Sequence, residues 1–494
     1  MKKISLIATL IQLSMLLPGC SNQESGFKNL PGKLPHLAVP QHPFLGPNGS
    51  NNMHDDAYMT DTYEYAGPQD LNPETKLKSY TDGMNTCVTM TFDSMGRMIT
   101  VDASMLNYKF LMLDPVSLDV IASYDLPSRD PMDPLFPYND TSGAAYFVMD
   151  NHERIIFADS ENALQIIRFD NETSKFVRVK RYDLSSYVVK MEPPAMDHVQ
   201  MALTDWSGRW LWFTTRYGVV GTLEQESGKV ETTLLQGEEL ENSFAVAEDG
   251  AYILSDHAMY RFHAGMDGEP EMDWRAEYDR GSRVKPGNFN QGSGSTPQVF
   301  GDMVAITDNA DPRMNVLFIQ RKDGEIACKV PVFDDNESTT ENAMPGWVRA
   351  GPQGLEYSVI IDNNYGIDRA SVLKPGRCWM NHVGNLARVD MLPDGKGGFT
   401  CRQVWRSREK SSQVLPKVSL LNGLLYVYTY KYVEEAGDYR FFFTAIDAGT
   451  GETRFKIPTG IGLDYANFGP PMAISPDGTA YLGTMKGLLS IRDR

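Results

Sequence analysis

The chain has little positive charge. Of its 494 residues, 46 are Lys or Arg and 64 are Asp or Glu, so the formal net charge is −18 at pH 7. A protein that binds nucleic acid needs a basic surface that neutralises phosphates. The composition therefore predicts no nucleic-acid partner and favours a soluble, acidic surface.

Long apolar runs are missing after residue 20. A membrane-spanning helix needs roughly 18 or more consecutive apolar residues, and no later run approaches that length. We therefore expect the rest of the chain to be soluble and to lie outside the cytoplasm.

The first 20 residues form a targeting segment. Lys2 and Lys3 precede the apolar stretch ISLIATLIQLSMLL, which ends in LPGC. This order resembles a bacterial lipoprotein signal, in which Cys20 becomes the lipidated first residue of the mature chain. An ordinary secretory signal with a chance cysteine is the alternative. The lipoprotein interpretation predicts a membrane anchor in the cell envelope, and Ser21 favours the outer membrane, facing the periplasm or exported to the surface.

Cysteine is scarce. No C-x-x-C pair occurs, so a zinc site has little support. Apart from Cys20, the chain contains Cys87, Cys328, Cys378 and Cys401. An even number in an oxidising compartment permits disulfides, with three possible pairings. Cys378 and Cys401 are closest in sequence and are the predicted pair.

Convincing helical patterns are missing too. Residues 21–80 are rich in Pro, Asn, Gly and Asp, which predicts a partly extended tether on the surface. Across residues 81–494, an apolar run repeatedly meets a turn of Gly, Asp or Asn and a second apolar run, as in FDSMGRMITVD and TDWSGRWLWFTT. Most copies continue into two more strand-like runs. This pattern predicts an all-β fold, a β-propeller of four-stranded antiparallel blades.

Eight copies of the pattern can be placed, which predicts eight blades, with seven as the alternative. The last copy, PMAISPDGTAYLGTMKGLLSIRDR, contains only three strands. The segment TKLKSYTDG, residues 75–83, is predicted to complete it and close the ring.

One repeat resembles those of a known family. Residues 441–460, FFFTAIDAGTGETRFKIPTG, resemble the A-x-D-x-x-T-G-x-x-x-W repeat of quinoprotein-like propellers, with Phe455 in place of the tryptophan. The resemblance implies the propeller fold. Family members include cofactor-dependent dehydrogenases and scaffolds. The dehydrogenases have adjacent cysteines near their quinone; none occur here, which argues against bound PQQ.

Polar links in the predicted fifth and sixth blades suggest a site. In a four-stranded blade, the link into the innermost strand and the link after the second strand lie at the same end of the channel. Residues 288–296 and 308–315 are such links in the fifth blade, and STTENAMPGW and DNNYG occupy these places in the sixth. Adjacent blades would bring them together at one mouth. Glycines there allow a ligand close to backbone amides.

The predicted ligand-binding residues at this mouth are Asn290, Ser293, Ser295, Thr296, Asn309, Arg313, Asn364 and Tyr365. The alternative is that short polar side chains at strand ends accept hydrogen bonds from the backbone.

The mouth is rich in carboxylate and amide oxygens, which Ca²⁺ prefers as ligands. In this it is similar to lactonase-type propellers, whose channel metal is held by Glu, Asn and Asp. The similarity implies a calcium-dependent hydrolase of lactones or esters, with Asp308, Glu341, Asn342 and Asn363 as metal ligands. The candidate catalytic residues are Asp308, Asp311 and His198.

A second hypothesis is a non-catalytic envelope scaffold. The long inserts SRDPMDPLFPYNDTSG and SSYVVKMEPPAMDH carry Met, Phe and Tyr at places expected to be exposed. Such loops suit the binding of another envelope protein, or they cover the mouth. A quinone-dependent oxidoreductase is the third hypothesis.

Overall fold

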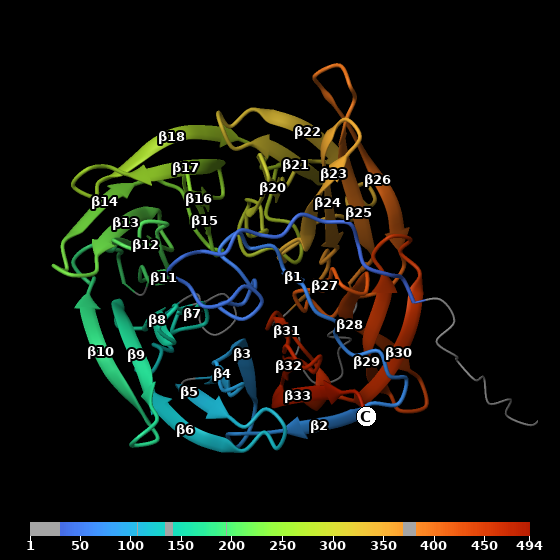
Figure 1. Ribbon diagram of the computed structural model, residues 1–494, viewed down its shortest axis with the longest axis horizontal. Coiled ribbons are helices and arrows are strands. Elements are labelled where there is room, and N and C mark those ends of the chain that lie inside the picture. Colours follow the sequence, from blue (N-terminus) through green and yellow to red (C-terminus); the bar gives the residue numbers. More distant parts are fainter. Residues whose placement is uncertain (1–29, 106, 134–141, 194, 369–381) are drawn as a thin grey trace, which may run out of the picture.

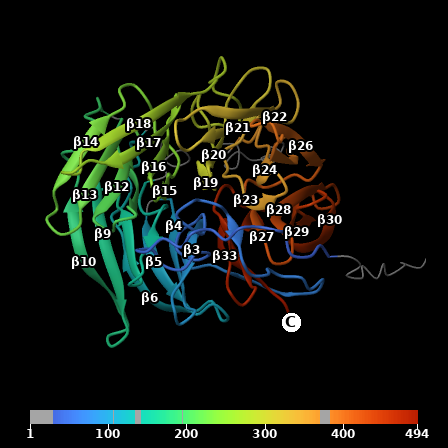
Figure 2. The same ribbon diagram turned by 45° about the horizontal axis from the view of Figure 1, so that its top comes forward.

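The computed structural model describes residues 30–105, 107–133, 142–193, 195–368 and 382–494. Within these ranges the chain forms β-strands and one short 3-10 turn, η2 (Leu463–Tyr465). The sheets stand around a central axis, each with its innermost strand toward that axis (Figures 1 and 2). This arrangement is a β-propeller. No helix in the described ranges is long and apolar enough to cross a membrane.

Five sheets contain four antiparallel strands each. In chain order they are β7 (Val148–Met149), β8 (Arg154–Ala158), β9 (Ala163–Asp170) and β10 (Lys175–Asp183); β11 (Val199–Thr204), β12 (Trp210–Thr215), β13 (Val219–Glu224) and β14 (Val230–Leu234); β15 (Ala245–Ala247), β16 (Gly250–Leu254), β17 (Ala258–Ala264) and β18 (Pro270–Glu277); β19 (Gln298–Phe300), β20 (Met303–Thr307), β21 (Asn315–Gln320) and β22 (Ile326–Pro331); and β23 (Gly346–Gly351), β24 (Gly354–Asp362), β25 (Leu386–Pro393) and β26 (Phe399–Ser407).

The two remaining sheets are larger. One consists of β27 (Lys417–Ser419), β28 (Leu424–Val433), β29 (Asp438–Asp447) and β30 (Thr453–Ile461), with β1 (Thr62–Tyr63) added in parallel along β27. The other contains β3 (Asn85–Phe92), β4 (Met98–Ser104), β5 (Tyr108–Leu113), β6 (Val120–Asp125), β31 (Met472–Ile474), β32 (Ala480–Thr484), β33 (Lys486–Arg492) and β2 (Glu74–Lys78).

The eight-stranded sheet is where the ring closes. Its strands form two antiparallel groups of four, β3 to β6 and β31 to β33 with β2, joined by a two-residue parallel pairing of β3 with β33. β2 pairs with β33 from Glu74, opposite Arg492, to Lys78, opposite Leu488. An early strand therefore completes the last group, as the sequence predicted for residues 75–83. The described strands thus give eight antiparallel groups of four in seven hydrogen-bonded sheets.

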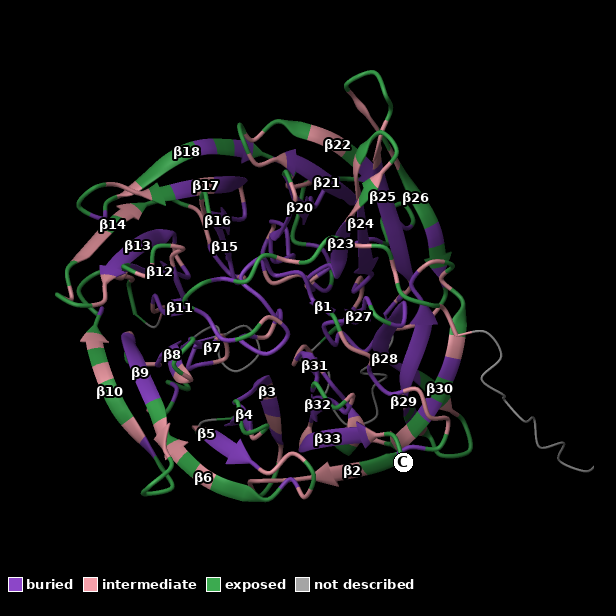
Figure 3. Cartoon of the chain, viewed as in Figure 1, coloured by how far each residue is buried: buried purple, intermediate pink, exposed green. Residues whose placement is uncertain are grey.

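Inner strands are apolar along their length because a neighbouring sheet covers each face. All six residues of β12, WLWFTT, are buried. The outer strand β18 instead alternates buried and exposed side chains from Asp273 to Glu277. Figure 3 shows the same change from purple inner strands to green and pink outer ones. The core therefore lies between adjacent sheets.

Residues 42–65 of the predicted tether lie inside the ring, so the expectation of a surface segment is wrong for them, whereas β2 of the same segment is an outer strand. Residues 42–65, here called the plug, cross the channel along the innermost strands (Figure 1). Five plug carbonyls accept hydrogen bonds from innermost strands of five sheets: Asn51 from Met149, Ala57 from Val246, Tyr58 from Val299, Thr60 from Gly346, and Asp61 from Val418. The inner edge of a sheet has unpaired N–H groups, and the plug satisfies them.

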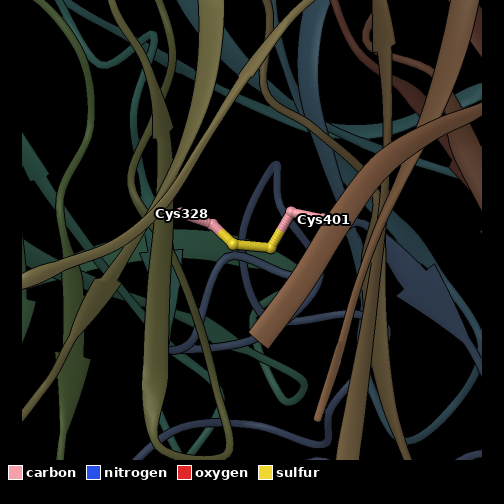
Figure 4. Close-up of a disulfide and its surroundings, with 2 residues drawn as sticks. All are labelled: Cys328 and Cys401. Atoms are coloured by element: carbon pink, nitrogen blue, oxygen red, sulfur yellow. A yellow bond between two sulfur atoms is a disulfide. The ribbon is translucent and has the colours of Figure 1, made fainter. Parts of the chain in front are cut away.

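A disulfide joins two outer strands. Cys401 in β26 pairs with Cys328 in β22, with a Cα–Cα distance of 6.3 Å (Figure 4). The predicted partner of Cys401 is therefore wrong, because two adjacent sheets bring together cysteines that lie far apart in sequence. Cys378 and the lipidation candidate Cys20 lie outside the described residues. Cys87 is buried with a free thiol.

Candidate site on the propeller axis

The links before β19 and β23 meet at one mouth of the channel. The backbone N–H of Phe289 donates to Glu341 Oε1 at 2.9 Å, and the Thr339 hydroxyl donates to Asn288. The loops of the predicted fifth and sixth blades therefore lie in contact.

Polar residues after β20 mainly hold the backbone at this mouth. Asp308 accepts hydrogen bonds from the N–H of Ala310 at 3.2 Å and of Asn315 at 2.7 Å, and Lys329 Nζ lies 3.1 Å from its carboxylate. Asn309 Nδ2 donates to three loop carbonyls. Asp308 thus accepts backbone N–H groups, as in the alternative interpretation, whereas Asn309 donates to backbone carbonyls.

The predicted calcium ligands have separate partners. Asn342 Nδ2 donates to Asp362 at 2.8 Å, and Asn363 Nδ2 donates to the carbonyl of Glu337 at 2.7 Å. Glu341 receives the N–H of Phe289, and Asp308 is bound as described above. Among the residues that the structure describes, no group of three His, Cys, Asp or Glu is placed to hold a metal ion.

The other predicted residues also make local contacts. Their partners are Ser295 for Ser293, Thr307 for Ser295, Gly292 for Asn290, Glu341 for Asn364, Asn363 for Tyr365, Asp335 for Arg313, and Ser282 for Asp311.

Two buried cationic or basic side chains lie at the mouth end of β11 and β12. The Arg216 side chain is 3% exposed; its Nη2 donates to Glu239 at 3.0 Å, and its Nη1 lies 3.4 Å from Glu241. Its Nε and Nη1 make no hydrogen bond to the described residues. The Arg216 N–H donates to the carbonyl of His198, whose Nε2 lies 2.7 Å from Asp133 Oδ2. His198 Nδ1 likewise has no hydrogen-bond partner in the described part of the chain.

Carboxylates lie around Arg216 and act on the neighbouring groups of the mouth. Burial raises the pKa of Tyr146, and the negative charges of Glu241 and Glu341 raise it further. The mouth near Arg216 therefore combines one guanidinium with several acidic side chains.

A second cluster, the axial cluster, joins the plug to three sheets. It consists of His54, Asp55 and Asp61 of the plug with Ser243, Thr296 and Lys417. Lys417 Nζ lies 2.6 Å from Asp61 Oδ1 and 3.0 Å from Asp55 Oδ2, and its side chain is fully buried. One cation thus neutralises part of the charge of two carboxylates, as a buried ionic group requires.

His54 connects a carboxylate to a hydroxyl in this cluster. Its Nδ1 lies 3.1 Å from Asp61 Oδ2, and its Nε2 lies 2.9 Å from Ser243 Oγ. The Thr296 hydroxyl lies 2.9 Å from Ser243 Oγ and 3.4 Å from His54 Nε2. Ser243 and Thr296 precede β15 and β19 and stand at the mouth end of these strands.

The two plug carboxylates differ in pKa. Burial raises the pKa of Asp55 above its usual range, and Lys417 only partly offsets this effect. For Asp61, burial also acts to raise the pKa, but the charge of Lys417 and the hydrogen bonds from His54 and Lys417 outweigh it, so the pKa is lowered. Asp61 is therefore the ionised partner of Lys417 and His54.

The plug backbone is strained around these groups. Asp55, Met59 and Asp61 have φ values of 77°, 59° and 52°, in the left-handed region that favours glycine. Strained residues of this kind persist only where the surroundings hold them, and they concentrate at functional sites.

The comparisons with known proteins concern the fold. No family model and no curated protein matches the chain. Among solved structures, the quinohemoprotein alcohol dehydrogenase from Comamonas testosteroni matches with a TM-score of 0.50 at 11% identity, over 90% of this chain and 80% of its own. The WD40 domain of SCAP from fission yeast and the C-terminal WD40 domain of Sif2 match with TM-scores of 0.48 and 0.46, both at 9% identity over 85% of this chain and 98% of their own.

These are likenesses of fold. The match to the quinohemoprotein alcohol dehydrogenase agrees with the β-propeller fold seen here. An identity of 11% to a dehydrogenase propeller assigns no chemistry to this chain, because one fold hosts many functions.

The sequence did not predict the axial cluster. Its signal was the stretch NNMHDDAYMTDTY, residues 51–63, which holds three Asp and one His beside aromatic residues. A surface tether has no need of Tyr and Met beside so many acidic groups. That density could have suggested a buried segment, but nothing in it names Ser243 or Lys417 as partners.

Proposed function

We propose that this protein is a cell-envelope propeller, anchored through a lipid on Cys20, that binds a small polar molecule at the mouth beside Arg216. The observation that carries the proposal is the buried Arg216 guanidinium, whose Nε has no hydrogen-bond partner among the described residues.

Buried polar groups almost always have a partner, and an unpaired one costs roughly 1–3 kcal/mol. Guanidinium groups match the oxygens of carboxylates and phosphates, and they also bind carbonyl oxygens. His198 Nδ1 provides a second unpaired buried position beside it. The ligand should therefore present acceptor oxygens to Arg216.

The acidic neighbours restrict the ligand further. Glu239 and Glu241 can accept hydrogen bonds from hydroxyl or ammonium groups. A small hydroxy acid, amino acid or lactone has both kinds of group. Beneath the mouth the plug crosses the channel, held by five innermost strands.

A thermal-shift screen of small hydroxy acids, amino acids and lactones tests this proposal. A ligand at 100 times its Kd stabilises the folded state by about 2.7 kcal/mol. We expect the shift to disappear in Arg216→Met and to persist in Arg209→Met, which removes a surface arginine paired with Glu224. A shift that survives Arg216→Met would contradict the proposal.

A calcium arm of the same screen tests the metal-dependent mechanism. If calcium supports the site, millimolar Ca²⁺ raises the Tm and chelator lowers it. No shift in either direction would remove calcium from the proposal and leave the ligand site in place.

Scaffolding is the second candidate, supported by exposed apolar side chains on the two long inserts. Met132 is 71% exposed and Tyr187 is 37% exposed. Crosslinked pull-down from envelope extracts tests it: partners lost on Met132→Asp but kept on Arg216→Met support the scaffold.

A further inference from the structure

Three side chains of the axial cluster lie in the order carboxylate, imidazole, hydroxyl. Asp61 Oδ2 lies 3.1 Å from His54 Nδ1, and Ser243 Oγ lies 2.9 Å from His54 Nε2. Because an ionised carboxylate only accepts hydrogen bonds, Nδ1 carries the proton toward Asp61. Nε2 of the neutral imidazole then accepts the hydrogen bond of the Ser243 hydroxyl.

The plug does not need this arrangement to stay in the channel. Five of its carbonyls are already bound by innermost strands, and Lys417 already pairs with Asp55 and Asp61. A hydroxyl aligned on the second nitrogen of an oriented imidazole is what nucleophilic catalysis needs.

We propose that Ser243, His54 and Asp61 form a nucleophilic triad that hydrolyses a small ester or lactone. The inference rests on the proposed function in one respect: the substrate enters from the mouth beside Arg216. The triad gives that site an activity and requires no metal.

The reaction balances with water as the only co-reactant. Ser243 Oγ attacks the carbonyl carbon of the ester, and its proton passes to His54 Nε2. The C–O bond to the leaving group breaks, and His54 returns the proton to the departing alkoxide. Water then attacks the acyl–Ser243 ester, again through His54, and releases the acid. Asp61 keeps the imidazole oriented and stabilises its charged form.

The position of Ser243 sets the route of access. It stands two residues after Glu241, and two residues span at most about 7 Å. A small molecule bound at Arg216 can therefore reach toward Ser243. Ser243 is 2% exposed, so a substrate must displace neighbouring groups to reach its hydroxyl.

Thr296 is the competing nucleophile. Its hydroxyl is also near His54 Nε2, but at 3.4 Å against 2.9 Å for Ser243. The shorter contact assigns the nucleophile to Ser243, and the position of a covalent adduct can separate the two.

A fluorophosphonate probe and p-nitrophenyl acetate test the proposal on the full chain. We expect one adduct per folded wild-type chain, mapped by peptide mass spectrometry to Ser243, and none on urea-unfolded protein. Ser243→Ala should lose labelling and slow ester hydrolysis by more than about 100-fold. Ser255→Ala, which removes another buried serine directly after β16, should retain both.

The absence of an adduct on folded wild-type protein would overturn the triad, as would an adduct on Thr296 or equal labelling of Ser243→Ala. Mapping on the wild type keeps the test valid even if Ser243→Ala fails to fold. Labelling needs no ligand at Arg216. A protein that binds its ligand but is not labelled therefore loses only the triad, and a labelled protein that binds none loses only the proposed function.

Discussion

At the scale of single residues, the bonding partners of a buried polar side chain distinguish a strand-end cap from a member of a side-chain cluster. Asp308 and Asn309 sit at a strand end and accept or donate backbone hydrogen bonds. His54 and Asp61 bond mainly to other side chains deep in the channel. In sequence both pairs are short polar residues beside apolar ones, so only the fold separates them.

Asp56 supports a prediction at this scale. Burial raises its pKa from 3.8 to about 7, although hydrogen bonds from Thr60 and Tyr58 oppose the shift. The folded state therefore binds more protons than the unfolded state between these values, and stability falls as the pH rises through this window. Asp56→Asn removes this dependence. Relative to wild type, the variant should gain about 2 to 3 kcal/mol between pH 5 and pH 8.

Urea unfolding of both proteins at the two pH values measures this gain. The comparison cancels the contribution of other titrating groups, including Asp362, whose pKa burial raises to about 6. An equal difference between variant and wild type at pH 5 and pH 8 would contradict the assignment.

At the scale of elements, outer strands need support that inner strands receive from packing. β22 and β26 are exposed along one face, and the Cys328–Cys401 disulfide joins them across the gap between two sheets. The disulfide closes a loop of 73 residues and so lowers the entropy of the unfolded chain. In the chain-entropy model this stabilises the folded state by up to about 4 kcal/mol. The bond is thus a covalent tie between neighbouring blades.

This pairing gives the second prediction. A non-reducing digest should contain one linked peptide pair with Cys328 and Cys401. Reducing agent should lower the Tm of wild type. The double variant Cys328→Ser, Cys401→Ser should already have this lower Tm without reducing agent and should not change when it is added. A linked peptide that contains Cys378 would show that a different pairing exists in solution.

At the scale of the whole molecule, the repeat pattern predicted the ring, and the closing strand β2 follows from one repeat having only three strands. The mouth loops were also predictable, because alternation of links in a four-stranded blade places them at one end. The plug was not, since residues 42–65 have no strand or helix period. Their structure comes from unpaired N–H groups on five innermost strands. Ser243 lies 189 residues from its partner His54 in sequence, and Lys417 lies 356 residues from Asp61.

The propeller is therefore held closed by its first described residues in two ways, through β2 and through the plug. If the chain is cut between β2 and β3, both β2 and the plug should therefore stay bound to the ring. Gly83 is exposed, and no atom lies within 4 Å of the position where a side chain would stand. A protease site inserted after Gly83 should be cleaved in the folded protein. The N-terminal fragment should then co-elute with the ring in gel filtration and separate only in denaturant.

Lys417→Met extends this test to the axial cluster. Removing one partner of a buried ion pair costs roughly 3–5 kcal/mol, because Asp61 and Asp55 lose their buried cation. The nicked variant should release its N-terminal fragment at a lower denaturant concentration than the nicked wild type. Arg313→Met, at an exposed ion pair worth at most about 1 kcal/mol, is the matched control and should change little. Release of the fragment from nicked wild type without denaturant would mean that neither β2 nor the plug holds the ring closed.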